Sequence, residues 1–171
     1  QILMRIAEEL KVSDFVPTDF ELKIDNDAEI KPYTVDLPDG GKLMIRGSID
    51  RVDTMNKNGK TYLRIIDYKS GGKTFALSDL FSGLNMQMMI YMFAVLGGGG
   101  EKYGDIFPAG VLYMPAKVGS DKSVRNSDAA TVMKEKLKST RLNGVITDDE
   151  TVILGMDKTV SGYFVNAVRK K

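Results

Sequence analysis

Apolar and polar residues alternate most regularly between Lys42 and Lys69, and the alternation breaks once, at Asn58-Gly59. An Asn-Gly pair between two alternating runs is the strongest short-range signal for a two-residue hairpin turn. The pattern therefore predicts a β-hairpin, with strands over about 42–53 and 60–69.

Weaker patterns flank this hairpin. Alternation indicates further strands, and apolar residues at helical spacing indicate helices, one of which stops at the glycine run 97–100. The predicted strands are 19–25, 30–36 and 109–115, and the predicted helices are 1–11, 78–96, 129–139 and 157–170. This mixture predicts an α/β (α+β) fold class.

Composition narrows the chemistry. The chain has 171 residues, of which 43% are apolar, which suits one folded domain. It has no cysteine and no histidine, which excludes disulfides, thiolate or imidazole metal sites, a cysteine nucleophile and Ser-His-Asp catalysis. Catalysis must then use Asp, Glu, Lys or Tyr, and oxygen-only ligands favour Mg²⁺ or Mn²⁺.

No apolar run approaches the roughly 18 residues of a membrane span, and no signal peptide is visible, so we expect no membrane association. The sequence begins at Gln1, inside a helical pattern without an upstream cap. We therefore expect a fragment of a longer protein.

The net charge is +1, but the charges are distributed unevenly. Residues 1–40 hold ten acids and four bases, whereas the remainder holds 13 acids and 20 bases. This asymmetry fits an acidic flank against a partner and a basic face toward phosphates, or equally two ordinary solvated surfaces.

The hairpin turn sets a register that brings two acids together. If Lys57 pairs with Lys60, Asp50 stands opposite Asp67, with Cβ atoms roughly 4.5–5.5 Å apart. Two carboxylates so placed repel each other, and a divalent cation between them reverses the sign of the interaction. The register therefore predicts a metal site.

The same register assigns the neighbouring residues. Lys69 lies on the face of Asp67, roughly 6.6–6.8 Å along the strand, where an ammonium can orient water or offset phosphate charge. On the other face Asp53 meets Arg64, which predicts a structural ion pair. A bulge would shift these pairings.

Gln87 and Tyr91 are four residues apart and share one face of a predicted helix. Taken alone, the pair fits a helix margin, with a tyrosine hydroxyl at the rim, at least as well as a functional site.

Three motifs together resemble a known family. They are Gly47-Ser-Ile-Asp50-Arg-Val-Asp53, Ile66-Asp67-Tyr-Lys69-Ser-Gly71 and Gly83-Leu-Asn-Met-Gln87-Met-Met-Ile-Tyr91. In this order they resemble the RecB-type branch of the PD-(D/E)XK nuclease superfamily, whose motifs are a GxxDRxD strand, a DYKxG strand and a QxxxY helix. Within that branch the chain is most similar to AddB-type nuclease domains of bacterial helicase–nucleases, over about residues 15–160.

The resemblance implies a restriction-endonuclease-like mixed central sheet, with the Asn-Gly hairpin, flanked by helices. It implies a single nuclease domain over 1–171, with a core at about 15–116 and a C-terminal extension at about 117–171, cut from a larger subunit. The implied function is an Mg²⁺-dependent exonuclease that hydrolyses DNA single strands at unwound ends, in double-strand-break processing and recombinational repair. The implied partner is an AddA-like helicase–nuclease subunit, and the implied location is the bacterial cytoplasm, at the nucleoid.

The resemblance also implies residue roles. Asp50 and Asp67 would hold the metal, with the Tyr68 main-chain carbonyl as a possible further ligand, and Lys69 would position the attacking water. Gln87 and Tyr91 would support the site or the phosphate. The segment Phe15-Val-Pro17-Thr-Asp-Phe-Glu21 resembles an upstream motif in which an acid helps to hold metal, which makes Glu21 a candidate third ligand.

DNA contacts are expected mainly at the phosphate backbone. The residues expected to make them are Arg51, Lys73, Lys134 and Lys138. The last two belong to the stretch 117–141, which holds seven bases against three acids and fits either a path for the strand or a solvated helix face.

The chain departs from the family in the cysteines that bind an iron–sulfur cluster. AddB-type domains commonly carry four cysteines that bind a 4Fe-4S cluster, and this chain has none. Either the cysteines lie outside the chain or the protein lacks the cluster.

Three other functions stay open from the sequence. The first is a non-catalytic DNA-binding or scaffolding domain. The intact set of Asp50, Asp67 and Lys69 argues against it. The second is a free-standing RecB-like exonuclease. The third, a Mg²⁺ phosphohydrolase of small substrates, lacks a glycine-rich phosphate loop before a helix.

Overall fold

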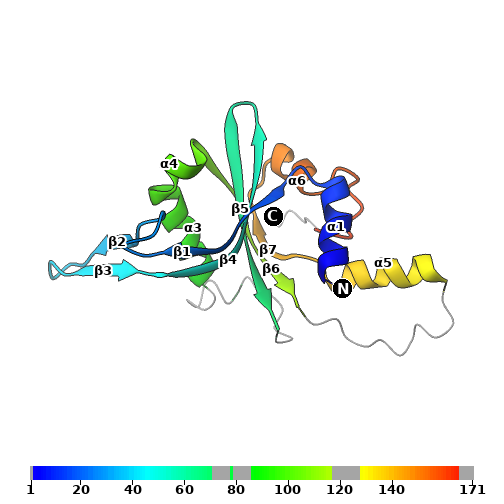
Figure 1. The fold of residues 1–171 in the computed structure, drawn as a ribbon, viewed down its shortest axis with the longest axis horizontal. Coiled ribbons are helices and arrows are strands. Elements are labelled where there is room, and N and C mark those ends of the chain that lie inside the picture. The colour runs from blue at the N-terminus through cyan, green and yellow to red at the C-terminus, as the bar shows by residue number, and fades with distance from the viewer. Residues whose placement is uncertain (1, 71–77, 79–85, 117–127, 166–171) are drawn as a thin grey trace.

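A five-stranded sheet forms the centre of the molecule (Figure 1). The computed structural model describes residues 2–70, 78, 86–116 and 128–165. The strand order is β1 (Val16–Ile24), β4 (Gly47–Lys57), β5 (Lys60–Lys69), β6 (Ile106–Pro115) and β7 (Asn143–Ile146). Only β5 and β6 pair in parallel, and the other three pairs are antiparallel. The sheet is mixed, as predicted.

Helices lie on both faces of this sheet (Figure 1). On one face α3 (Gln87–Gly98) and α4 (Gly100–Tyr103) pack over a core cluster that includes Val52, Ile65 and Met92. On the other face α1 (Ile2–Val12), α5 (Ala129–Ser139) and α6 (Glu150–Met156) pack near a second cluster, which includes Phe15 and Ile66. The predicted α/β fold with flanking helices is confirmed.

The hairpin has the predicted turn and register. Asn58 and Gly59 both have positive φ, 54° and 75°, as the favoured two-residue turn requires. Lys57 pairs with Lys60, and Val52 pairs with Ile65. The strand predicted to begin at Lys42 is divided, however. Its first part, β3 (Lys42–Ile45), pairs with β2 (Tyr33–Asp36) in a separate two-stranded ribbon that projects from the sheet (Figure 1).

The structure confirms two of the predicted helices, confirms a third in part and contradicts the fourth over residues 157–165. The helices at 1–11 and 129–139 are confirmed. The helix predicted over 78–96 is α3 from Gln87 onward, its earlier part lies mostly outside the described residues, and α4 begins within the glycine run. The helix predicted over 157–170 is wrong for residues 157–165, because the Asp157 side chain accepts hydrogen bonds from Thr159 and Ser161 in a turn, and Val160 has a φ of 49°. Neither β7 nor α6 was predicted.

A buried network of charges fixes α1 to the sheet. Arg64 donates to Asp53 (Nε to Oδ2, 2.9 Å), which confirms the predicted pair, and also to Glu9 of α1 (Nη2 to Oε1, 2.7 Å). Arg5 pairs with Glu9, and Arg51 pairs with Asp53. All five side chains are at most 3% exposed. These ion pairs therefore join the N-terminal helix to the strand that carries Asp50.

None of the helices in the described part of the chain has both the length and the apolar character needed to cross a membrane.

Candidate active site

Strands β1 and β4 depart from regular alternation at the same row. Ile49 and Val52 are three residues apart, yet both belong to the core cluster beneath α3, whereas strict alternation would place them on opposite faces. Opposite them in β1, Glu21 has a φ of 51°, in the left-handed region that non-glycine residues seldom adopt. Glu21 and Asp50 lie between the registered pairs Phe20–Arg51 and Leu22–Ile49. The distortion is thus centred on two predicted metal ligands, and such strain often marks functional sites.

This distortion changes the predicted relationship between Asp50 and Asp67. The ladder between β4 and β5 ends at Arg51 and Ile66, one residue before the predicted pair. Asp50 instead turns its carboxylate to the backbone of β5, where Oδ2 accepts a hydrogen bond from the Tyr68 N–H at 2.8 Å. The two acids are therefore not a registered face-to-face pair. Each meets a donor of its own, which relieves part of the repulsion inferred from the sequence.

Asp67 and Lys69 form the centre of the site. Lys69 Nζ lies 2.6 Å from Asp67 Oδ2, and the two side chains are 41% and 19% exposed, Lys69 being the more open. Burial alone would lower the pKa of Lys69, but the close contact and charge of Asp67, with smaller contributions from Tyr113 and Asp50, raise it above its usual value. Lys69 is therefore a cation at neutral pH, and not a proton acceptor.

Tyr113 is a site neighbour that the sequence reasoning missed. It lies on β6 in register with Asp67 of β5, and its ring centroid is 5.1 Å from Lys69 Nζ. A cation above a ring face is held by the negative potential of that face. The strand at 109–115 was predicted, but its parallel register against β5, which brings Tyr113 to Lys69, has no local sequence signal.

One carboxylate oxygen at the site fits a ligand of the predicted divalent cation. Solvent does not reach Asp67 Oδ2, and apart from its ion pair this oxygen accepts no hydrogen bond of good geometry from the described residues. A shielded carboxylate oxygen whose near partner is the half-exposed Lys69 suits a ligand position for a hard ion.

Glu21 is not placed as a third ligand. Its side chain is exposed and accepts a hydrogen bond from the Ser48 hydroxyl at 3.3 Å. In the described ranges, no three acidic side chains are arranged to hold a metal ion. Glu21 nevertheless lies on β1, one strand away from Asp50.

The two helix residues of the third motif are in contact with each other. Gln87 Nε2 donates to the Tyr91 hydroxyl at 2.8 Å, with Gln87 exposed and Tyr91 buried. The Tyr91 ring packs so closely on Gly47 of β4 that a Cβ atom there would overlap the hydroxyl. The helix motif is thereby held against the strand that carries Asp50, three residues away.

The structure describes three of the four residues predicted to contact DNA, and they differ in exposure. Arg51 was expected to reach DNA, and this is wrong for the described structure: it is 0% exposed and donates to both oxygens of Asp53, at 2.5 and 2.7 Å. Lys73 lies outside the described residues. Lys134 and Lys138 are exposed on α5, where Lys138 also faces the Tyr163 ring (5.9 Å to the centroid).

Comparison with known proteins identifies the family. A family model described as the PD-(D/E)XK nuclease superfamily matches residues 2–158. A protein of Clostridium acetobutylicum, named as the B-type component of an ATP-dependent helicase/deoxyribonuclease, is 35% identical over 92% of this chain. Proteins of the same name from Clostridium botulinum and a Thermoanaerobacter species are 37% identical over the same share. The chain spans 14% of the length of each of these relatives. With its motifs, its mixed sheet and a family match over almost its full length, the chain belongs to the PD-(D/E)XK nuclease superfamily.

Proposed function

We propose that this chain is a metal-dependent deoxyribonuclease that hydrolyses phosphodiester bonds in single strands of DNA, working from DNA ends. The observation that carries the proposal is the grouping of Asp50, Asp67 and Lys69 where the β4–β5 ladder ends, with Asp67 Oδ2 at its centre, shielded from solvent and 2.6 Å from Lys69 Nζ.

The side chains have distinct roles in this proposal. Asp50, oriented by the Tyr68 N–H, and Asp67 hold Mg²⁺ or Mn²⁺, and the Tyr68 carbonyl is a further candidate ligand. Glu21, one strand away, joins them only if its exposed side chain turns away from Ser48. When bound, the ion supplies Lewis-acid stabilisation of the charge that builds on the phosphate.

Lys69 supplies a fixed positive charge beside the same phosphate. Its raised pKa keeps it protonated at neutral pH, so it orients water and offsets negative charge in the transition state. Gln87 and Tyr91 form a hydrogen-bonded pair beside Gly47, where they support the position of the strand.

The names of the relatives support a wider setting. We infer that the chain is the nuclease module of a longer AddB-type protein, working with an AddA-like helicase–nuclease partner in double-strand-break repair and recombination in the bacterial cytoplasm. In that setting a motor delivers the unwound strand. An iron–sulfur cluster cannot be bound by this chain itself, which has no cysteine.

The test is cleavage of end-labelled single-stranded DNA in the presence of Mg²⁺, with and without EDTA. The wild-type chain should shorten the DNA only with the metal. Asp67→Asn should lower the rate on the order of 10² or more, the scale for loss of one preorganised electrostatic group. Asp105→Asn, which changes a carboxylate outside the site, is the matched control. EDTA-resistant cleavage, or full activity of Asp67→Asn, would overturn the proposal.

A further inference from the structure

We propose that Phe20 and Tyr68 form a stacking platform for unpaired bases of single-stranded nucleic acid, on the face of the sheet opposite Asp67. The inference rests on the proposed function for its substrate class, and it adds a binding site that the nuclease motifs do not include.

Phe20 is an unexplained exposed aromatic residue. It lies on β1, the edge strand of the sheet, and 62% of its side-chain surface is open to solvent. It therefore contributes little to the core, whereas Phe15, at the start of the same segment, is fully buried. Single exposed apolar side chains are common on protein surfaces, and what distinguishes Phe20 is its position, next to Glu21 and in the row beside Asp50.

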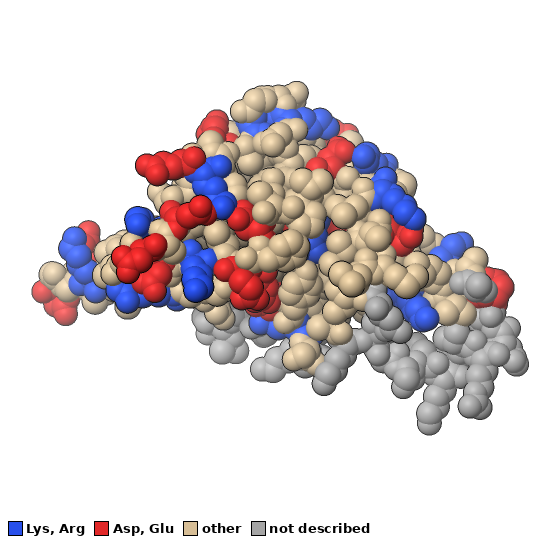
Figure 2. Space-filling model, viewed as in Figure 1, with Lys and Arg blue, Asp and Glu red and all other residues tan. Residues whose placement is uncertain are grey.

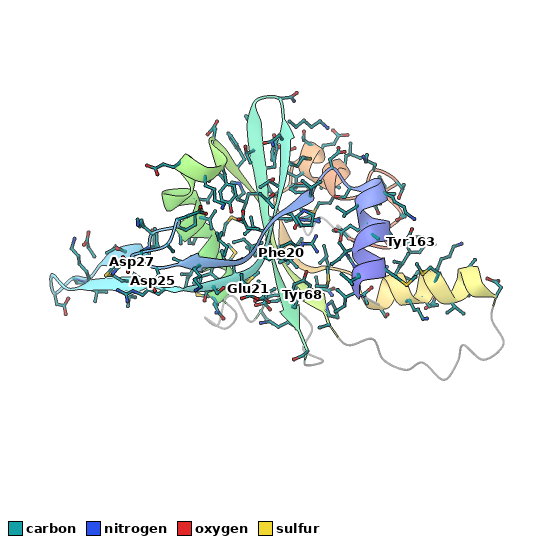
Figure 3. The ribbon with its side chains drawn as sticks, viewed as in Figure 1. Phe20, Glu21, Asp25, Asp27, Tyr68 and Tyr163 are labelled. Carbon is teal, nitrogen blue, oxygen red and sulfur yellow. The ribbon has the colours of Figure 1, made fainter. Side chains whose placement is uncertain are left out.

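The register places Tyr68 on the same side of the sheet. Phe20 pairs with Arg51 across β1 and β4, and Arg51 pairs with Ile66 across β4 and β5. Tyr68 follows Ile66 by two residues, so its side chain projects to the same face. Figure 3 shows both aromatic residues at this part of the sheet, with Glu21 next to them.

The floor between the two rings is rigid. The Arg51 guanidinium is held by both oxygens of Asp53, and its Nη1 lies 3.5 Å from the Tyr68 hydroxyl. Since Arg51 is fully buried, it cannot swing out to meet a phosphate. Its role here is to fix the Tyr68 ring, which packs partly buried against the second core cluster and keeps the rest of its surface open to a ligand.

Each ring is adjacent in sequence to a site acid. Tyr68 follows Asp67, and the pleat directs the two side chains to opposite faces of β5. Phe20 precedes Glu21, in the row next to Asp50. A strand that passes around this end of the sheet, from the face of Asp67 to the face of the rings, places a phosphate at the carboxylates and a neighbouring base at the rings.

Exposed aromatic rings favour single-stranded over double-stranded nucleic acid. Base faces are exposed only where bases are unpaired, and stacking on aromatic side chains tolerates any base sequence. Charge alone does not hold a polyanion here, since Glu21 is exposed, the exposed Asp25 and Asp27 follow it toward the β2–β3 ribbon (Figure 3), and acidic side chains are frequent on this part of the surface (Figure 2). Stacking of bases on the two rings supplies the attraction for the strand, which these acids cannot supply.

The chain has no tryptophan, so Phe20→Trp introduces a single fluorescent reporter at the proposed platform. An oligothymidine, added with Ca²⁺ in place of Mg²⁺ and checked to be intact, should quench this tryptophan saturably. A duplex of the same length should not. The control is Phe93→Trp, at a residue of α3 that is 47% exposed and packs on Tyr33 of the ribbon, where no quenching is expected.

Binding of the same labelled oligothymidine is followed in parallel by fluorescence anisotropy. Phe20→Ala should raise the Kd about 5- to 150-fold, the range for loss of one stacked base. It should also raise KM with little change in kcat, whereas Tyr68→Phe, which keeps the ring, should bind as the wild type does.

These measurements separate the two proposals. Binding with no quenching of Phe20→Trp, or no binding at all, overturns the platform, whatever the cleavage assay gives. Quenching in a protein that does not cleave DNA supports the platform and contradicts the nuclease function. An unchanged Kd for Phe20→Ala overturns the platform while leaving the nuclease function intact.

Discussion

The Tyr91 ring of α3 occupies the space in which a side chain at Gly47 would stand. This contact joins two of the three nuclease motifs, since Gly47 opens the strand of Asp50 and Tyr91 closes the helix motif that starts at Gln87. Glycine is required at position 47 by this close approach, and not by its backbone angles.

Gly47→Ala should therefore damage both folding and activity. The new Cβ atom forces Tyr91 away, at a cost of about 1–3 kcal/mol in the free energy of unfolding, typical of overpacking. Chemical denaturation and the cleavage assay measure the two effects. Gly97→Ala is the control, because no atom lies within 4 Å of a Cβ atom there, and it should leave both measurements nearly unchanged.

A second variant, Gly47→Ala with Tyr91→Leu, separates packing from function. The smaller side chain makes room for the Cβ atom, so stability should recover toward that of Tyr91→Leu alone. Activity should stay low if the hydrogen bond from Gln87 to the Tyr91 hydroxyl supports the site. A fully active double variant would limit Tyr91 to a packing role.

The local turn signal predicted the hairpin, but contacts with a distant strand determine where the pairing of β4 with β5 ends. Asn58-Gly59 sets the turn and the register up to Arg51 and Ile66, because turn chemistry acts over a few residues. The ladder stops there because β4 loses its regular alternation at Asp50, opposite the left-handed Glu21 of β1. No pattern within the hairpin encodes the pairing of β4 with a strand about 30 residues earlier.

The same distinction explains Arg51. Arg51 was expected from the sequence to contact the DNA backbone, whereas strand alternation places it on the face of Asp53. Its complete burial goes with the docking of α1, which carries Glu9 to Arg64 and covers that face beside Asp53. Docking of a helix about 40 residues away cannot be read from the strand itself.

Arg51→Met should consequently weaken the fold and not DNA binding. It leaves the Asp53 carboxylate buried with one partner fewer, and breaking a buried pair costs about 3–5 kcal/mol. Urea denaturation measures this loss. Arg46→Met is the matched control, because Arg46 is 52% exposed and its ion pair with Asp25 is 3.5 Å long, a type worth at most about 1 kcal/mol. Normal stability with weakened DNA binding would restore Arg51 as a DNA contact.

Glu9 should make stability fall at acid pH. Burial alone would raise the pKa of Glu9, but the guanidinium groups of Arg64 and Arg5 outweigh it and lower the pKa below its usual 4.5. A lowered folded pKa gives stability that is present above the usual value and is lost as pH falls through the folded value. Glu9→Gln should be destabilised at pH 7, and its stability should fall less steeply than that of wild type below about pH 4.5. Parallel slopes for the two proteins in denaturation measured across that range would contradict this role.

The lysines of α5 test whether DNA follows this helix. Lys134 and Lys138 are one turn apart and exposed, and Lys138 pairs only weakly with Glu135, at 3.6 Å. If both meet phosphates of a single strand, neutralising them as Lys134→Gln and Lys138→Gln reduces the slope of log K against log salt by about 1.4, which is about 0.7 for each contact. The control changes Lys57 and Lys60 to Gln at the hairpin turn, at the end of the sheet opposite Asp67. A salt slope that is the same in both double variants would show that these lysines form a solvated face, and would leave the strand to be held by the site and by Phe20 and Tyr68.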